Sequence, residues 1–234
     1  MRQGAGLNLA DIPASAARDE SGVTEAIAHF GRKHLPLPLR LIRDPAFAIR
    51  ALRYALRLPT PLRTRDRWVL EQVILPAVEE RSGNQTVVFV GCDYYTWHYK
   101  RFFKGHRYIT IDPDQGRARF GGKEHHVDFL SNLPLLLAAG SVDAIICNGV
   151  VGFGVNDPQE ADRSFTACAN VLKPGGLLVL GWTPGSCSFD PMKTAAISRH
   201  FEPGGLPSLG SNFVETPTAY RQTFAILSRR AVTG

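Results

Sequence analysis

The chain has 234 residues, a formal net charge of +6 and an apolar fraction of 44%, which is ordinary for a globular protein with one substantial core. It has no apolar run long enough to span a bilayer, and residues 1–21 lack the basic start and apolar centre of a secretory signal. Four scattered cysteines without CxxC spacing are typical of free thiols in a reducing compartment. We therefore expect a cytoplasmic protein without a transmembrane segment, and we favour free thiols over disulfides or a zinc site.

The first 82 residues divide into two parts. Residues 1–21 are rich in Gly, Ala, Asp and Ser, which predicts a disordered lead. Residues 22–82 predict a helical N-terminal cap in which proline pairs separate the helices. Thr64 is a plausible N-cap for the last of them. The expected helices run over Thr24–Lys33, Ala46–Leu58 and Arg65–Arg81.

A basic stretch coincides with this cap: ten Lys and Arg residues and only two Asp lie between Arg32 and Arg67. In the helix expected over 46–58, Arg50, Arg53 and Arg57 share one face. Three readings stay open: a solvated face, contact with an acidic partner or acceptor such as a phosphate, a carrier protein or RNA, and weak attachment to a membrane surface. Because no RNA-binding motif accompanies the stretch, nucleic acid is not the partner we expect.

From Thr86 onward, strand-like and helix-like segments alternate. The strand-like runs are continuously apolar, as in parallel strands that helices cover on both faces. This pattern predicts an α/β fold. Strands are expected over Thr86–Val90, Tyr108–Ile111, His125–Val127, Val142–Cys147, Leu177–Trp182, Phe213–Thr216 and Thr223–Ser228. Helices are expected over Trp97–Phe103, Asp114–Phe120, Ser131–Ala139, Asp157–Leu172 and Pro191–Phe201.

Two neighbouring strand ends carry the pattern of a nucleoside site. One apolar run breaks at Gly91, and the next ends in Asp112, a spacing that suits a tight turn followed by a carboxylate for ribose hydroxyls. A simple surface turn at Asp112 is the alternative. A dinucleotide site needs two further glycines, but Asp93 and Thr96 stand at those positions, where their side chains would crowd or repel a phosphate. A nucleoside cofactor without phosphate is therefore favoured, and S-adenosylmethionine is the common one.

Three later motifs complete a recognisable set. Val127-Asp128-Phe129 follows the third strand, where the acid could hold an adenine or cap the next helix. Asn148-Gly149-Val150 ends the fourth strand, and Leu172-Lys173-Pro174-Gly175-Gly176 precedes the fifth. In this order and spacing, residues from about 84 to 230 resemble the class I S-adenosylmethionine-dependent methyltransferases.

The resemblance implies a Rossmann-like, mostly parallel seven-stranded sheet with helices on both faces over residues 83–234, and S-adenosylmethionine as cofactor. The family's first motif usually begins with an acid and carries two or three glycines, whereas this chain has Phe89 and keeps only Gly91. By position, the resemblance implies Gly91, Cys92 and Asp93 for the methionine part, Asp112 and Pro113 for the ribose, Asp128 and Phe129 for the adenine, and Asn148, Gly149 and Val150 beside the sulfonium.

Aromatic segments after the first and fourth strands predict the wall of an acceptor pocket, or else the packing of a helix on the sheet. His98 is the candidate general base because imidazole titrates near neutral pH, and a structural role is its alternative. The adjacent His125 and His126 point to opposite faces of a strand, so we expect no metal site there. The acceptor candidates are Tyr94, Tyr95, Phe153, Asn156 and Trp182.

The function expected from the sequence is methyl transfer to an O, N or C atom of a small-molecule acceptor, with specialised or saccharide metabolism as its setting, since the chain has no separate recognition domain. Two alternatives stay open. A non-catalytic methyltransferase-like binding or regulatory protein would explain the reduced glycine motif. A nucleic-acid methyltransferase would use the basic stretch. The acceptor, the methylated atom and the oligomeric state do not follow from the sequence.

Overall fold

The computed structural model describes residues 64–81, 85–206, 209–218 and 221–231, together with Ile49, Leu52, Arg53, Leu56, Leu58 and Leu62. The lead expected over residues 1–21, the helix expected over Thr24–Lys33 and most of the helix expected over Ala46–Leu58, with Arg50 and Arg57, lie outside the described residues. Within the described ranges, every helix is too short or too polar to cross a membrane. The domain boundaries at residues 21 and 82 remain predictions.

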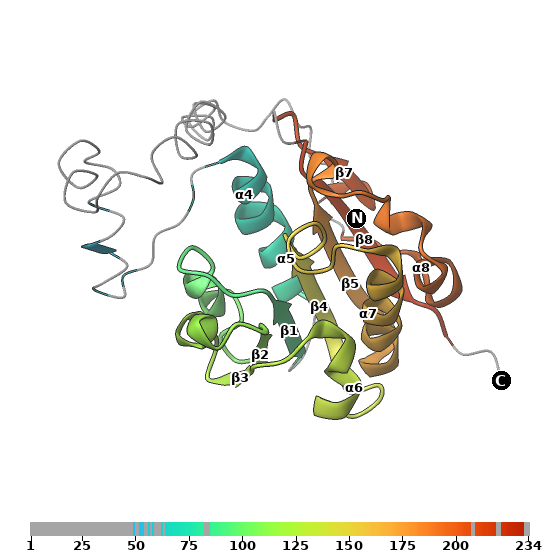
Figure 1. Cartoon of the computed structure of the whole chain (residues 1–234), viewed down its shortest axis with the longest axis horizontal. Coiled ribbons are helices and arrows are strands. Elements are labelled where there is room, and N and C mark those ends of the chain that lie inside the picture. The colour runs from blue at the N-terminus through green and yellow to red at the C-terminus, as the bar shows by residue number, and fades with distance from the viewer. Residues whose placement is uncertain are drawn as a thin grey trace, which may run out of the picture.

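One mixed sheet forms the centre of the molecule (Figure 1). Its strand order is β3-β2-β1-β4-β5-β8-β6, with β7 also beside β8. The first five strands run parallel, and β8 runs antiparallel to β5. The mostly parallel sheet expected from the sequence is confirmed. The strands are β1 (Thr86–Val90), β2 (Arg107–Ile111), β3 (Glu124–His126), β4 (Val142–Asn148), β5 (Leu172–Trp182), β6 (Phe201–Pro203), β7 (Phe213–Glu215) and β8 (Thr223–Arg229).

Two short strands share the position at the far side of β8. β6 pairs with residues 227–229 of β8, and β7 pairs with residues 223–225. Because β5 pairs with the other side of β8, β6 and β7 lie end to end in one row. Eight strands therefore fill seven positions, as the family pattern implies. β6 was not expected: the helix predicted to reach Phe201 ends at His200, and Phe201 starts a strand instead.

Helices cover both faces of the sheet (Figure 1). Side chains alternate along β1, so Val88 and Val90 pack with one helical layer, and Val87 and Phe89 pack with the other. This two-sided burial explains the continuously apolar strands. The first layer contains α6 (Leu133–Leu136), α7 (Pro158–Val171) and α8 (Ala195–His200), and the second contains α4 (Arg65–Val69) and α5 (Leu75–Glu79).

The crossovers near β2 differ from the expected α-helices. Trp97–Arg101 and Gln115–Phe120 form 3₁₀-helices, and the helix expected over Ser131–Ala139 shrinks to α6 and one preceding 3₁₀ turn. A parallel crossover needs about a dozen residues or more, and residues 112–123 barely provide them between β2 and β3. The tighter helix fits where a full α-helix with a loop at each end does not. The long helix α7 matches its expected range, and Asp157 caps it.

The N-terminal helix is continuous from Arg65 to Glu79, because a π-helical segment (Leu70–Ile74) joins α4 to α5. The Thr64 side chain accepts a hydrogen bond from the Arg67 N–H, as expected for an N-cap. Asp66 Oδ1 accepts from the hydroxyls of Thr216 at 2.8 Å and Thr218 at 2.9 Å. These bonds anchor the start of the helix to the turn between β7 and β8.

The Leu172–Gly176 motif lies at the amino edge of the sheet, opposite the strand ends that carry the candidate acids. Asp143 Oδ2 accepts from the Thr86 N–H at 2.8 Å, and its Oδ1 pairs with Lys173 Nζ at 2.7 Å. A Cβ at Gly176 would lie 2.8 Å from the carbonyl oxygen of Lys173, so a side chain does not fit there. The motif therefore joins the beginnings of β1, β4 and β5, and its role is structural.

Candidate functional site

A cavity of about 550 Å³ opens at the carboxyl ends of β1, β2 and β4. This edge of a parallel sheet is where α/β proteins bind ligands, because the loops after neighbouring strands converge there. The cavity therefore lies beside Gly91 and Asp112, the two residues from which the sequence predicted a nucleoside site. Its lining consists of Val90, Gly91, Ile111, Asp112, Pro113, Asp114, Arg117, Asp128, Phe129, Leu130, Ser131, Asn132, Gly149, Val150, Phe153, Gly154, Val155 and Glu160.

The first four N–H groups of the loop after β1 are all hydrogen-bonded, two of them to Ile111 and Asp112. Gly91 takes a φ of +83°, which favours glycine, and its N–H donates to the carbonyl of Ile111. The next three N–H groups donate to the Asp112 carboxylate (2.7 Å), the Thr96 hydroxyl (2.9 Å) and the Asp93 carboxylate (2.7 Å). Phosphate sites of dinucleotide-binding proteins need such N–H groups free. The loop is thus well ordered and unsuited to a pyrophosphate.

Asp112 is the best-defined group of the cavity. Its exposed fraction is 4%, its Oδ2 accepts from the Cys92 N–H and its Oδ1 accepts from the Asp114 N–H at 2.9 Å. Since each carboxylate oxygen can accept more than one hydrogen bond, acceptor capacity remains for two ribose hydroxyls. Burial, followed by the charge of Asp112, raises the pKa of the Cys92 thiol to about 12. Cys92 therefore contributes its backbone N–H, and its neutral thiol lies outside the cavity lining.

Two largely exposed aromatic rings line the cavity. Phe129, in the loop after β3, is 61% exposed, and Phe153, in the loop after β4, is 67% exposed. Such rings can stack on the flat face of a base. Asp128 Oδ1 accepts from the Phe129 N–H and from Asn132 Nδ2, both at 2.7 Å. Asp128 thus holds the local turn and lines the cavity at the same time, so both roles considered for it are compatible.

β4 lies between β1 and β5 in the sheet, and the residues at its end form part of the cavity wall. Gly149 and Val150 line the cavity, whereas Asn148 is buried behind them. Asn148 Oδ1 accepts from Gln222 Nε2 at 2.8 Å. The Val150 carbonyl then accepts from three successive N–H groups, those of residues 153–155, at 2.8–3.1 Å. This compact loop fixes the position of Phe153.

A sequence model of a methyltransferase domain matches residues 90–180. The matched segment contains every residue that lines the cavity. Residues 90–180 thus carry a class I S-adenosylmethionine-dependent methyltransferase domain. S-adenosylmethionine is the methyl donor that this family implies, and the residues of the cavity fit it. They offer a buried carboxylate for the ribose and aromatic rings for the base, and the loop N–H groups that a phosphate would need are already hydrogen-bonded.

Solved structures share the fold at low sequence identity. A TehB-like S-adenosylmethionine-dependent methyltransferase from Corynebacterium glutamicum ATCC 13032 gives a TM-score of 0.52 at 15% identity, over 80% of this chain and 100% of that one. The N-methyltransferase NodS from Bradyrhizobium japonicum WM9, in complex with S-adenosyl-L-homocysteine, gives 0.51 at 16% identity, over 70% of this chain and 92% of that one. No curated protein matches the chain. These likenesses show the fold alone.

His98 lies outside the lining of this methyltransferase cavity. Its buried ring has Nε2 3.4 Å from Glu71 Oε1, and its Nδ1 is buried without a partner among the described residues. The Tyr99 hydroxyl donates to the same Glu71 oxygen at 2.9 Å and accepts from Arg67 at 3.2 Å. The Arg67 guanidinium also covers the Tyr95 ring at 4.7 Å. The aromatic segment thus packs the β1 loop against the N-terminal helix, and a catalytic role of His98 remains a prediction.

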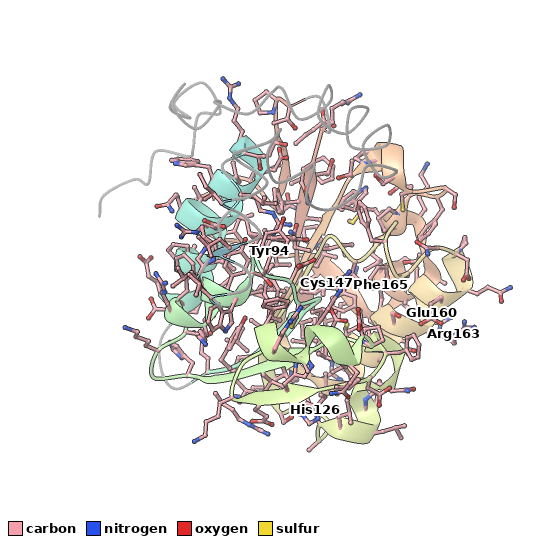
Figure 2. The ribbon with its side chains drawn as sticks, turned by 60° about the vertical axis from the view of Figure 1, so that its left-hand side comes forward. Tyr94, His126, Cys147, Glu160, Arg163 and Phe165 are labelled. Carbon is pink, nitrogen blue, oxygen red and sulfur yellow. The ribbon has the colours of Figure 1, made fainter. Side chains whose placement is uncertain are left out.

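The residues expected to form the pocket for the methyl acceptor do not all line this cavity. Phe153 lines the cavity, but Tyr94 (labelled in Figure 2) stands edge-on to the Tyr95 ring. The Asn156 carbonyl accepts from the Ser188 hydroxyl. Trp182 lines a second cavity of about 640 Å³ beside Phe213. The structure therefore does not gather the five candidates into one acceptor pocket.

Sequence reasoning missed three charged residues of the cavity, namely Asp114 in the turn after Asp112, Arg117 and Glu160. Arg117 lies in the 3₁₀-helix after β2, and its spacing from Asp114 is the only local signal for it. Glu160 lies in the first turn of α7, where Figure 2 shows it next to Arg163, whose Nη2 donates to Glu160 Oε2 at 2.7 Å. Neither Arg117 nor Glu160 is adjacent to a strand end. Among the described residues, no group of three or more His, Cys, Asp or Glu could hold a metal ion.

Proposed function

We propose that the domain transfers a methyl group from S-adenosylmethionine to an O, N or C atom of a small-molecule acceptor. The observation that carries the cofactor part is Asp112, a buried carboxylate that two backbone N–H groups hold in place at the wall of the cavity. A charge with little exposure to water needs such partners, and its remaining acceptor capacity suits a pair of hydroxyls.

The neighbouring residues would hold the rest of the nucleoside. Asp112 and Pro113 would receive the ribose, and Asp128 and Phe129 would receive the adenine, because they follow adjacent strands in the sheet. Phe153 lines the same cavity from the opposite loop and offers a second ring to the base. We place Gly149 and Val150 near the reactive end, since they follow β4 next to the β1 turn.

The chemistry needs little from the protein beyond positioning. S-adenosylmethionine supplies an electrophilic methyl group on a positively charged sulfur. Four carboxylates line the cavity (Asp112, Asp114, Asp128 and Glu160) against one guanidinium, that of Arg117. Their negative potential favours a cationic ligand over the uncharged thioether left after transfer. Holding donor and acceptor in line would then supply much of the rate.

A small acceptor is supported by the size of the site and by the chain around it. Between β4 and β5, residues 149–157 form one compact loop, and α7 fills the rest. The described ranges thus contain no inserted recognition domain between these strands. A cavity of about 550 Å³ lies in the range of small-molecule sites.

Calorimetric titration of S-adenosylmethionine into wild type and Asp112→Ala tests the cofactor part of this proposal. We expect binding to wild type and an affinity about 10–100-fold weaker for the variant, the usual cost of hydrogen bonds to a charged group. Asp190→Ala is the matched control, because this exposed carboxylate caps a turn outside the cavity.

Absence of heat with wild type would refute the proposal. Binding without methyl transfer to any member of a broad acceptor panel would favour a non-catalytic role. Salt-sensitive RNA binding that is lost on neutralising Arg50, Arg53 and Arg57 would favour a nucleic-acid acceptor.

A further inference from the structure

Arg117 lines the cavity and stands among three carboxylates, of which Asp112 and Asp114 also line the cavity and Asp93 lies outside its lining. Its Nη1 lies 3.8 Å from Asp93 Oδ2 and 4.0 Å from Asp112 Oδ2, and its Nε lies 3.4 Å from Asp114 Oδ2. All three distances exceed the roughly 2.7–2.9 Å of a charged hydrogen bond. The side chain is 47% exposed and lines the cavity. The three carboxylates therefore attract the guanidinium without a close hydrogen bond to it, and its N–H groups remain available to a ligand.

Asp93 is the partner that the loop after β1 presents to Arg117. Its Oδ1 accepts from the Tyr94 N–H at 2.7 Å, and its backbone is fixed through Thr96. Its Oδ2, which faces Arg117, remains able to accept hydrogen bonds from a ligand. Because the same Arg117 nitrogen lies close to both Asp93 and Asp112, these two carboxylates are neighbours.

The order of the strands indicates which part of the cofactor would lie beside Asp93 and Arg117. Adjacent strands β3, β2 and β1 end beside Asp128 and Phe129, then Asp112, then Asp93. If the adenine lies after β3 and the ribose after β2, the substituent on the ribose 5′ carbon extends toward β1. In S-adenosylmethionine that substituent ends in an α-amino acid with one ammonium and one carboxylate.

We infer that Arg117 and Asp93 together recognise the zwitterionic amino-acid end of the cofactor, an inference that rests on the proposed function. Asp93 accepts hydrogen bonds from the ammonium, and the Arg117 guanidinium donates to the carboxylate, a geometry for which its planar fork is suited. The pair replaces the acid that the family's first motif places before its glycines. At that position this chain has Phe89, which is buried edge-on against Tyr99 at 5.3 Å and cannot reach a ligand.

Two ligands separate this role from support of the ribose site. S-adenosylmethionine carries the amino acid, whereas 5′-methylthioadenosine has the same nucleoside and sulfur without it. We would measure the affinity of both ligands for full-length wild type, Asp93→Asn and Arg117→Met by calorimetry. Arg119→Met is the matched control: it removes the same charge from the same 3₁₀-helix, where Arg119 covers the Phe120 ring outside the cavity.

We expect each site variant to weaken S-adenosylmethionine binding by about tenfold or more, as for the loss of a charged hydrogen bond, and to leave 5′-methylthioadenosine binding unchanged. The control should change neither. If Arg117→Met fails to fold, Arg117→Lys keeps the charge but loses the fork and should still weaken S-adenosylmethionine selectively.

Equal weakening of both ligands would overturn the inference, since Arg117 would then act through Asp112 and the ribose. Unchanged S-adenosylmethionine binding in both site variants would also overturn it. The proposed function fails separately, and the inference with it, when wild type binds neither ligand.

Discussion

Substituting Gly181 by alanine should destabilise the protein through one neighbour, Asn148. Gly181 lies in β5 directly opposite Asn148 of β4. A Cβ there would overlap Asn148 Oδ1 and stand 3.0 Å from Phe224 Cε1. Ordinary contact distances require the Asn148 oxygen to move by about 1 Å or more. Because Asn148 is buried and hydrogen-bonded to Gln222, it has little freedom to do so.

The expected magnitude follows from what this movement breaks. Loss of the Gln222 hydrogen bond costs about 0.5–1.5 kcal/mol, and a side chain forced off its rotamer costs about 0.5–1.5 kcal/mol. The free energy of unfolding should therefore fall by about 1–3 kcal/mol. For a chain of this length, each kcal/mol lowers the melting temperature by about 2–4 °C.

Urea denaturation followed by circular dichroism measures this difference. Gly185→Ala is the matched control, because nothing lies within 4 Å of a Cβ at that exposed glycine. The decisive comparison uses an Asn148→Ala background, in which the obstructing oxygen is gone. There Gly181→Ala should cost less than about 0.5 kcal/mol, which makes the two substitutions strongly coupled.

Two results would refute this reasoning. Equal loss of stability in both backgrounds would assign the cost to Phe224 or to the backbone. A Gly181→Ala variant as stable as Gly185→Ala would show that Asn148 moves freely, and the hydrogen bond to Gln222 would then have no measurable effect on stability.

Two further predictions concern stability and thiol chemistry. Asp66→Ala should lower the free energy of unfolding by about 2–4 kcal/mol, because two threonine hydroxyls lose their charged acceptor; a urea midpoint equal to that of wild type would contradict this. Burial raises the pKa of Cys92 to about 12, so its thiolate fraction near pH 8 is about one in ten thousand and grows as the pH rises. The partly exposed Cys187 should therefore react first with iodoacetamide at pH 8, as followed by mass spectrometry, and equal rates for Cys92 and Cys187 would contradict the burial of Cys92.

The sequence by itself predicted the sheet and several of the residues that line the cavity at its carboxyl edge. β1 matches its expected range to the residue, and Gly91 and Asp112 line the cavity, while their role in holding a cofactor stays a prediction. The reason is local: parallel strands buried on both faces must be continuously apolar, so the first polar residue after each run marks the ligand-binding edge. From the missing glycines after Gly91 the sequence predicted that side chains would crowd or repel a phosphate. The structure adds a different reason, since the N–H groups of this loop are already hydrogen-bonded.

Only the tertiary structure decided which side chains meet across the chain. His98 belongs with Glu71 and not with the cavity, because the N-terminal helix packs on the loop after β1. The position of Arg117 between Asp93 and Asp112 depends on a 3₁₀-helix that the short crossover imposes, and no sequence period indicates it. Periodicity reports which face of an element is buried, but contacts between residues far apart in sequence follow from how the elements pack. For this protein, those contacts place the charges that would select the cofactor.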